Sequence, residues 1–190
     1  MSENILLKAE HIDKRFGITH AVNDVSININ HGEIRALIGE NGSGKSTFCQ
    51  MLCGIYSIGG GTFTLDGQVM HVRNQVEANN LGVSIIVQEM GTLSGLSVAE
   101  NIFVGRQPMK HGQINWKEIN RRASELMSRF HLDIDVTRPL SYYSTAIQQM
   151  ASIARAVDIQ AKILILDEPT SSLDDNEVQL LFSVMRELKA

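Results

Sequence analysis

The sequence predicts an α/β domain with a mainly parallel sheet, on the basis of two observations. Ile34–Ile38, Val83–Val87 and Ile163–Leu166 are short apolar runs, which are typical of strands covered on both faces. Segments with helical periodicity separate these runs, and alternation of buried strands with helices favours a parallel sheet.

An antiparallel β part is predicted near the N-terminus. In Asn23–Asn30 apolar and polar residues alternate, which is the pattern of a half-buried strand. The dipeptide Asp66-Gly67 lies between the apolar segments Thr62–Leu65 and Val69–Val72, and such a dipeptide favours a tight hairpin turn.

The middle of the chain, from about Leu96 to Asp158, is mainly helical in pattern. Asn115 and Glu118 have the spacing of a reciprocal cap, in which the amide side chain caps the helix and the acid bonds back. A further helix is predicted to begin at Ser144, with one apolar face.

We interpret the helical stretch as a subdomain inserted into a single domain that spans residues 1–190. The predicted helical subdomain covers residues 93–158, and the predicted core covers residues 1–92 and 159–190. A last helix, which opens with Asp174, completes this core.

Composition and charge narrow the class of protein. A net charge of −4 does not indicate a basic face for phosphodiesters, although a local basic patch is compatible with it, and we do not expect a nucleic-acid partner. No apolar run approaches the roughly 20 residues that cross a bilayer, and charges interrupt the N-terminus where a secretory signal is apolar. We therefore expect a cytosolic location unless a partner holds the protein at a membrane. Cys49 and Cys53 are interpreted as helix-packing residues.

A glycine-rich loop gives the most specific indication of chemistry. The sequence from Gly39 to Ser46 satisfies G-x-x-x-x-G-K-[ST], between a predicted buried strand and a predicted helix. Backbone N–H groups of such a loop surround phosphate oxygens, the lysine reaches the β- and γ-phosphates, and the serine hydroxyl binds Mg²⁺. The alternative is an ordinary glycine turn before a helix. The predicted phosphate-binding residues are Gly39, Glu40, Asn41, Gly42, Ser43, Gly44, Lys45, Ser46 and Thr47.

Two carboxylates follow the apolar run Ile163–Leu166. Ligands of open α/β sheets bind at the carboxyl ends of strands, where Asp167 and Glu168 stand. Beside a phosphate loop, Asp167 is predicted to hold Mg²⁺ and Glu168 to orient or deprotonate the attacking water. Alone, such an acid pair is equally typical of a strand-end turn.

With these motifs the sequence resembles the ATP-binding subunits of ABC transporters, most closely those of bacterial monosaccharide importers of the ribose and galactose type. The resemblance covers essentially the whole chain. Val87-Gln88-Glu89 resembles the Q-loop, which implies that Gln88 contacts Mg²⁺ or water and senses the transmembrane partner. Leu96–Ile102 is similar to the importers' helical subdomain, and Ser171–Asp174 resembles the D-loop at the dimer seam.

The resemblance also assigns the adenine-stacking aromatic to Phe16, for which the alternative is a buried core residue. Two positions depart from the family pattern. In the signature Tyr143–Gln149, Ser144 is kept, but Ala146 replaces a glycine. The family's switch histidine is also missing, because the last histidine is His131. We interpret the chain as C-terminally incomplete, and the alternative is an ATPase that lacks a catalytic part.

The resemblance implies a dimer of nucleotide-binding domains in which Mg-ATP on one core meets the Ser144 region of the other. Hydrolysis would then power sugar import through transmembrane permease subunits, with a periplasmic sugar-binding protein as an indirect partner. The location implied is the cytoplasmic face of the inner membrane. With no switch histidine, we expect this chain to bind ATP but to turn it over slowly or not at all. Two alternatives remain: a soluble ABC ATPase of DNA repair or translation, and a binding-only module with a degenerate signature.

Overall fold

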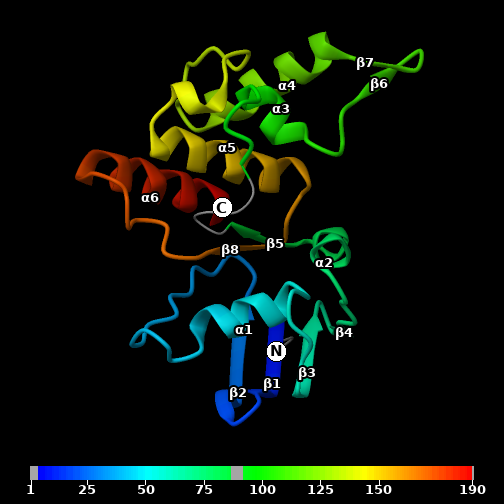
Figure 1. Ribbon diagram of the computed structural model, residues 1–190, viewed down its shortest axis with the longest axis vertical. Helices are drawn as coiled ribbons and strands as arrows, with labels where there is room; N and C mark the ends of the chain where they lie inside the picture. The colour runs from blue at the N-terminus through cyan, green and yellow to red at the C-terminus, as the bar shows by residue number, and fades with distance from the viewer. Residues whose placement is uncertain (1–3, 87–91, 190) are drawn as a thin grey trace. The chain divides into compact units, whose positions relative to one another are not determined.

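The computed structural model describes residues 4–86 and 92–189, and the chain divides into two compact units (Figure 1). The first unit comprises Met1–Ser84 with Lys189–Ala190, and the second comprises Ile85–Leu188. Gln88, predicted to contact Mg²⁺, lies outside the described residues. Each unit is described by itself.

The first unit is built on a four-stranded antiparallel sheet with the order β2-β1-β3-β4. Its strands are β1 (Ile5–Phe16), β2 (Thr19–Asn30), β3 (Gly60–Leu65) and β4 (Gln68–Val69). From Val25 to Asn30 half-buried and exposed residues alternate, so the predicted half-buried strand is confirmed.

The hairpin predicted at Asp66-Gly67 is also confirmed. Leu65 pairs with Gln68, and the two residues between them have φ of 48° and 76°. Two consecutive positive φ values define the tight turn that matches strand twist, and glycine adopts them without a steric cost. The strand after the turn is shorter than the predicted Val69–Val72.

Helix α1 (Lys45–Leu52) lies across one face of this sheet, and α2 (Gln75–Leu81) follows β4 (Figure 1). Phe48 of α1 packs edge-on against Phe63 of β3, with ring centroids 5.6 Å apart. Both rings are buried, so the apolar face of α1 is fixed on the sheet by packing. Cys53, just after α1, is fully buried, in agreement with its predicted packing role.

The strand predicted at Ile34–Ile38 is not formed. Residues 33–40 have no regular secondary structure, and the side chains of Ile34 and Ile38 are 47% and 92% exposed. A strand in the middle of a parallel sheet requires a partner on each side, and these partners are far apart in sequence. An apolar run predicts that a segment can be buried in a sheet, but it does not predict which strands pair with that segment.

The second unit is mainly helical. Its helices are α3 (Val98–Phe103), α4 (Trp116–Arg129), the 3₁₀ turn η1 (Leu140–Tyr142), α5 (Thr145–Asp158) and α6 (Asp175–Lys189). Its strands are β6 (Met109–Lys110), β7 (Gln113–Ile114) and β8 (Ile163–Leu166), and β5 (Val83–Ile86) spans the boundary between the units.

The core of the second unit confirms the predicted helices. Met150, Ala151 and Ala154 of α5 are buried in a cluster that also contains apolar residues of α3, α4 and α6. Asn115 caps α4, since its side chain accepts a hydrogen bond from the Glu118 N–H (3.3 Å). The predicted return bond from Glu118 is not made, because its carboxylate pairs with the Arg121 guanidinium (2.6 Å).

Strands β5 and β8 pair with each other, and their C-terminal ends meet, because the Asp167 N–H donates to the Ile86 carbonyl (3.1 Å). The α/β class is therefore confirmed, although the larger sheet among the described residues is antiparallel. Residues 159–188 belong to the second unit, together with the helices. The sequence instead predicts residues 159–190 in the ATP-binding core, and the predicted subdomain boundaries remain a prediction.

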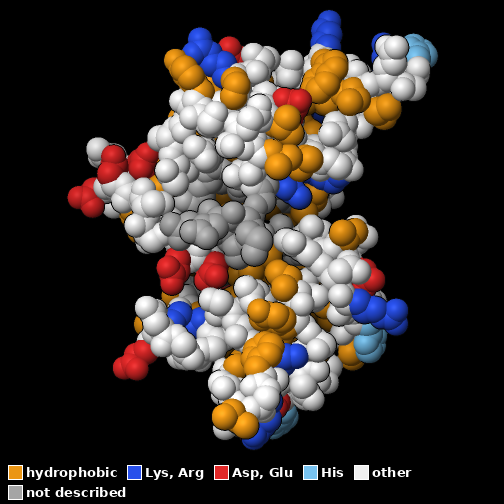
Figure 2. Space-filling view, in the orientation of Figure 1, with side chains coloured by type: hydrophobic (Ala, Val, Ile, Leu, Met, Phe, Trp, Pro, Cys, Tyr) orange, Lys and Arg blue, Asp and Glu red, His pale blue; other side chains and the backbone are white. Residues whose placement is uncertain are grey.

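The β6–β7 hairpin carries apolar side chains at the surface of the second unit (Figure 2). Met109 is 60% exposed, and Trp116, just after the hairpin, is 48% exposed. Among the described residues, no helix has the length and apolar character needed to span a membrane.

Candidate nucleotide site

The phosphate loop leads into α1 through Gly44, which has a left-handed φ of 92°. A Cβ at this position would lie 2.1 Å from the Ala21 carbonyl oxygen of β2. Glycine is therefore required at position 44 for two reasons: the backbone conformation is left-handed, and β2 lies too close for a side chain. Gly42 also has a positive φ, 82°, but a Cβ there would meet no atom within 4 Å.

Lys45 is the first residue of α1, and its side chain folds back over the loop. The Nζ atom donates to the carbonyl oxygens of Gly39 (2.8 Å) and Glu40 (2.9 Å). The Ser43 N–H donates to the Glu40 carbonyl (3.1 Å), which closes a turn inside the loop. An ammonium group is thus held at the same loop as the backbone amides that precede the helix.

This arrangement fits a nucleotide phosphate and its magnesium ion. The N-terminal end of α1, which carries partial positive charge, follows a glycine-rich loop that is exposed to solvent. Ser46 is exposed in the first turn of α1, and Thr47 follows it. A hydroxyl next to the phosphate-binding lysine is the type of ligand that Mg²⁺ accepts in such loops.

Phe16, at the end of β1, is 43% exposed, so it is not part of the core. The Tyr56 ring meets it edge-on at a centroid distance of 5.1 Å, and the Lys14 Nζ lies 5.2 Å from its centroid. Neither neighbour was predicted, because Tyr56 is 40 residues away in the sequence and no local pattern links it to Phe16. Stacking of Phe16 on adenine remains a prediction.

The acid pair follows β8 in the second unit. Asp167 is half-buried and Glu168 is exposed. Glu168 has a φ of 47°, a conformation that side chains other than glycine adopt at a cost, and its carbonyl accepts from the Ser171 N–H (3.3 Å). The turn that follows β8 therefore places the Glu168 carboxylate in solvent, and the roles in Mg²⁺ binding and water activation remain predictions.

The signature begins at the N-terminus of α5. Ser144 is the exposed N-cap residue, and its side chain makes no capping hydrogen bond. Ala146, which replaces the family glycine, lies within the helix and is only 2% exposed. Its methyl group therefore packs into the protein, and it is not presented to a ligand at the helix end.

Asp174, the last residue of the predicted D-loop, caps α6. Its carboxylate accepts from the Glu177 N–H (2.9 Å), and the Glu177 carboxylate accepts from the Asp174 N–H (3.2 Å). This reciprocal pair satisfies backbone donors at the start of α6. The predicted contact of Asp174 with a nucleotide remains a prediction.

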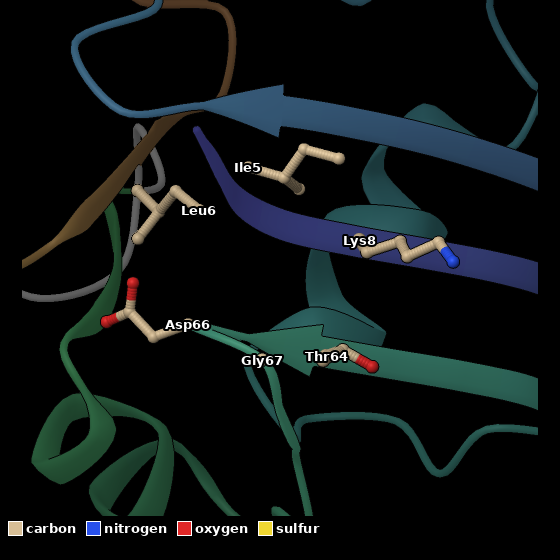
Figure 3. Close-up of a pocket in the computed structure, with 6 residues that line it drawn as sticks. All are labelled: Ile5, Leu6, Lys8, Thr64, Asp66 and Gly67. Carbon is tan, nitrogen blue, oxygen red and sulfur yellow. The ribbon is translucent and has the colours of Figure 1, made fainter. Parts of the chain in front are cut away.

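A separate shallow pocket of about 380 Å³ lies in the first unit (Figure 3). It is lined by residues of β1 and of the β3–β4 hairpin: Ile5, Leu6, Lys8, Thr64, Asp66 and Gly67. None of these residues belongs to the predicted nucleotide site. The pocket therefore plays no part in the predicted chemistry.

The predicted site residues come from both units. Phe16 and Gly39–Thr47 belong to the first unit, whereas Ser144, Asp167, Glu168 and Asp174 belong to the second. A lysine-bearing glycine loop at a helix start, with an acid pair after an apolar strand, defines the P-loop NTPase class.

Residues 22–171 match the family model described as "ABC transporter". The chain therefore belongs to this family. It is 45% identical over 184 residues to the galactofuranose transporter ATP-binding protein YtfR of Escherichia coli strain K12. It is 43% identical over 188 residues to the ribose import ATP-binding protein RbsA of Hahella chejuensis.

These matches cover 97% and 98% of this chain but 37% and 38% of the two relatives, so the chain spans little more than a third of their length. Among solved structures, the ATP-binding cassette MJ1267 in its ADP conformation has a TM-score of 0.86 at 24% identity, over 97% of this chain and 77% of that one. The protein cbiO1 of Clostridium perfringens has a TM-score of 0.82 at 28% identity, over 98% and 74%. These likenesses confirm the predicted cassette fold.

Proposed function

We propose that this chain binds Mg-ATP and, in a dimer of nucleotide-binding domains, hydrolyses it to power sugar import through a membrane permease. The observation that carries the proposal is the phosphate loop. Gly44 is packed against the Ala21 carbonyl, and the Lys45 ammonium is held over the Gly39 and Glu40 carbonyls. This loop has the donors and the charge that the terminal phosphates of a nucleotide require.

Different residues of the chain are proposed to bind the phosphates, to hold the metal ion and to orient the attacking water. Lys45 and the loop amides neutralise and orient the phosphates, while Ser46 and Asp167 are the residues that would hold Mg²⁺. The ion, when bound, supplies additional positive charge at the transferring phosphoryl group. Glu168 orients the attacking water, and its exposed carboxylate is accessible for this role.

The proposed second core supplies its Ser144 region to the nucleotide. Exposure of Ser144 at the start of α5 supports this arrangement, because its hydroxyl is not used in capping its own helix. A solved relative of the same fold, the cassette MJ0796, is described as a dimer bound to ADP and phosphate. The methyl group of Ala146 is buried, so it does not cover the helix end beside Ser144.

Sugar import is proposed because the relatives named above are a galactofuranose transporter protein and a ribose import protein. The permease is proposed to bind the second unit, where Met109 of the β6–β7 hairpin and Trp116, which follows the hairpin, are exposed. The periplasmic sugar-binding protein is an indirect partner through the permease. The protein would then work at the cytoplasmic face of the inner membrane.

Substitution of the phosphate-loop lysine tests the proposal. Lys45→Ala is expected to weaken Mg-ATP binding at least about 100-fold, since it removes a charge-assisted contact to the phosphates. Lys110→Ala, on the exposed β6 strand, is the matched control and should bind as the unchanged protein does. Affinity is measured by isothermal titration with Mg-ATP. Retention of full affinity by the Lys45 variant would refute the proposal.

A further inference from the structure

Three polar side chains are joined at the base of the β1–β2 turn. Asp13 and Arg15 of β1 both contact the ring of His20 on β2, at a point where the register of the two strands shifts between Lys14 and Arg15. The His20 Nε2 atom is 2.5 Å from the Asp13 Oδ2 atom, and the His20 Nδ1 atom is 3.0 Å from the Arg15 Nη2 atom. The His20 side chain is 22% exposed and that of Asp13 is 35% exposed.

The partners of His20 determine which of its nitrogens carries the proton. A guanidinium group has only donors, so the Nδ1 atom of His20 accepts from Arg15. The proton is then on the Nε2 atom, which donates to the Asp13 carboxylate. Both ring nitrogens are therefore used, and the imidazole is fixed in one orientation between the two strands. We refer to Asp13, Arg15 and His20 as the hairpin latch.

The hairpin latch lies between two parts of the proposed nucleotide site. On one side, Arg15 is followed by Phe16, the proposed base-stacking residue, at the end of β1. On the other side, His20 is followed by Ala21, whose carbonyl occupies the space that a side chain at Gly44 would need. A shift of β2 at His20 would therefore move both the turn that follows Phe16 and the backbone that supports the phosphate loop.

The latch is also tied to the rest of the sheet. The Asp13 carbonyl accepts from the Gly59 N–H (2.9 Å), and Asp13 pairs with Gly60 of β3. Lys14, the residue between Asp13 and Arg15, donates to the Ser57 carbonyl (2.6 Å). The Asp13 end is thus anchored, and the histidine adds a side-chain link to the backbone pairs that join β2 to β1 near the turn.

We propose that His20 is a positioning residue for the nucleotide: it sets the spacing between the aromatic ring of Phe16 and the phosphate loop at Gly44. It makes no contact with the nucleotide in this proposal and acts through the hairpin. The proposal rests on the nucleotide site proposed above. A ligand that has both a base and a triphosphate requires this spacing, whereas an inorganic triphosphate requires only the loop.

A second histidine–aspartate pair on the same two strands provides a matched control. The His11 Nδ1 atom is 2.6 Å from the Asp24 Oδ1 atom, and these side chains are 79% and 68% exposed. The pair lies beside Ile12 and Val25, away from the turn and from Ala21. Loss of this pair removes a similar hydrogen bond without affecting the hairpin latch.

The experiment compares the affinities of Mg-ATP and magnesium tripolyphosphate for the unchanged chain, His20→Ala, His20→Gln and His11→Ala, by isothermal titration. His20→Ala is expected to weaken Mg-ATP binding about tenfold, equivalent to about 1.4 kcal/mol, and to leave tripolyphosphate binding unchanged. His20→Gln keeps a donor for Asp13 and should recover part of the loss, while His11→Ala should match the unchanged chain.

Thermal unfolding of each variant shows whether it folds, and Asp13→Ala, which removes the acceptor of the His20 Nε2 proton, replaces His20→Ala if the latter does not. An equal loss for both ligands, or no loss for Mg-ATP, would overturn the proposal. Lys45→Ala separates this outcome from failure of the proposed function, because that variant should lose both ligands. If Lys45→Ala retained both, the nucleotide site itself would be wrong.

Discussion

At the scale of single residues, the two left-handed glycines of the phosphate loop have different surroundings. Gly42 needs its glycine only for a φ of 82°, since a Cβ there would meet open space. At Gly44 a side chain is disfavoured by the left-handed φ and also by the Ala21 carbonyl oxygen, which a Cβ atom would overlap. The motif alone makes these two glycines equivalent, and the contact with β2 distinguishes them.

Alanine substitutions at the two glycines should therefore differ. Gly42→Ala should cost about 1–2 kcal/mol through its φ alone. Gly44→Ala adds a collision with a carbonyl and should lower Mg-ATP affinity further, because α1 or β2 has to move. Denaturant unfolding and titration with Mg-ATP measure both effects. Equal effects of the two variants would contradict the importance of the Ala21 contact.

The thiols of Cys49 and Cys53 should react at different rates. Burial, with a smaller contribution from the nearby Cys49, raises the pKa of the Cys53 thiol to about 12. Because the thiolate is the reactive form, Cys53 should be inert at pH 8, and its reactivity should rise only as the pH approaches 12. Labelling with a thiol reagent, followed by mass mapping, should find Cys49 modified first. Fast labelling of both residues in the folded protein would contradict this prediction.

At the scale of elements, side chains cap the starts of three helices in the second unit, and α5 begins without such a cap. Ser97 caps α3, Asn115 caps α4 and Asp174 caps α6. Each cap is local in sequence, which is why the openings at Asn115 and Asp174 were recognisable without a structure. The way in which these helices pack against each other depends on residues far apart in the chain.

Asp174→Ala should destabilise the chain by about 1 kcal/mol through loss of the α6 cap. Asp174→Asn keeps a capping acceptor and should be close to neutral in stability. If Asp174 also has the predicted role at a dimer seam, both variants should lower ATP turnover, but only the alanine variant should unfold more easily. Denaturant unfolding of the two variants separates these roles.

One carboxylate joins three elements of the second unit. Asp158, at the end of α5, is 7% exposed and pairs with Arg106, which follows α3, and with Arg122 of α4. Asp158→Ala should cost about 2 kcal/mol in unfolding free energy, below the range for fully buried pairs because both arginines are about a third exposed. Glu125→Ala, which breaks an exposed pair with Arg121, should have little effect on the denaturation midpoint.

At the scale of the whole molecule, the predicted site residues are divided between the two units. Lys45 and Ser46 belong to the first, whereas Asp167 and Glu168 belong to the second. The proposed roles of Asp167 and Glu168 can be tested without any permease or sugar.

Asp167→Asn should weaken Mg-ATP binding several-fold but leave binding of ATP in the presence of a chelator almost unchanged, because the carboxylate acts on the metal ion. Glu168→Gln should bind Mg-ATP normally and lose the slow hydrolysis that the unchanged chain supports. Titration and phosphate release measure these effects. Equal weakening with and without Mg²⁺ would contradict the role of Asp167 as a metal ligand.

The sequence by itself determined the family, the phosphate loop, the Asp66-Gly67 turn and most helix starts, because each depends on residues within a few positions of one another. Only the tertiary structure decided that Phe16 is exposed beside Tyr56, that Ala146 is buried, and that Gly44 abuts Ala21. It also showed that Ile34–Ile38 forms no strand among the described residues. These features depend on pairing and packing between distant segments, and a local pattern of residue types contains no information on which distant segment becomes the neighbour.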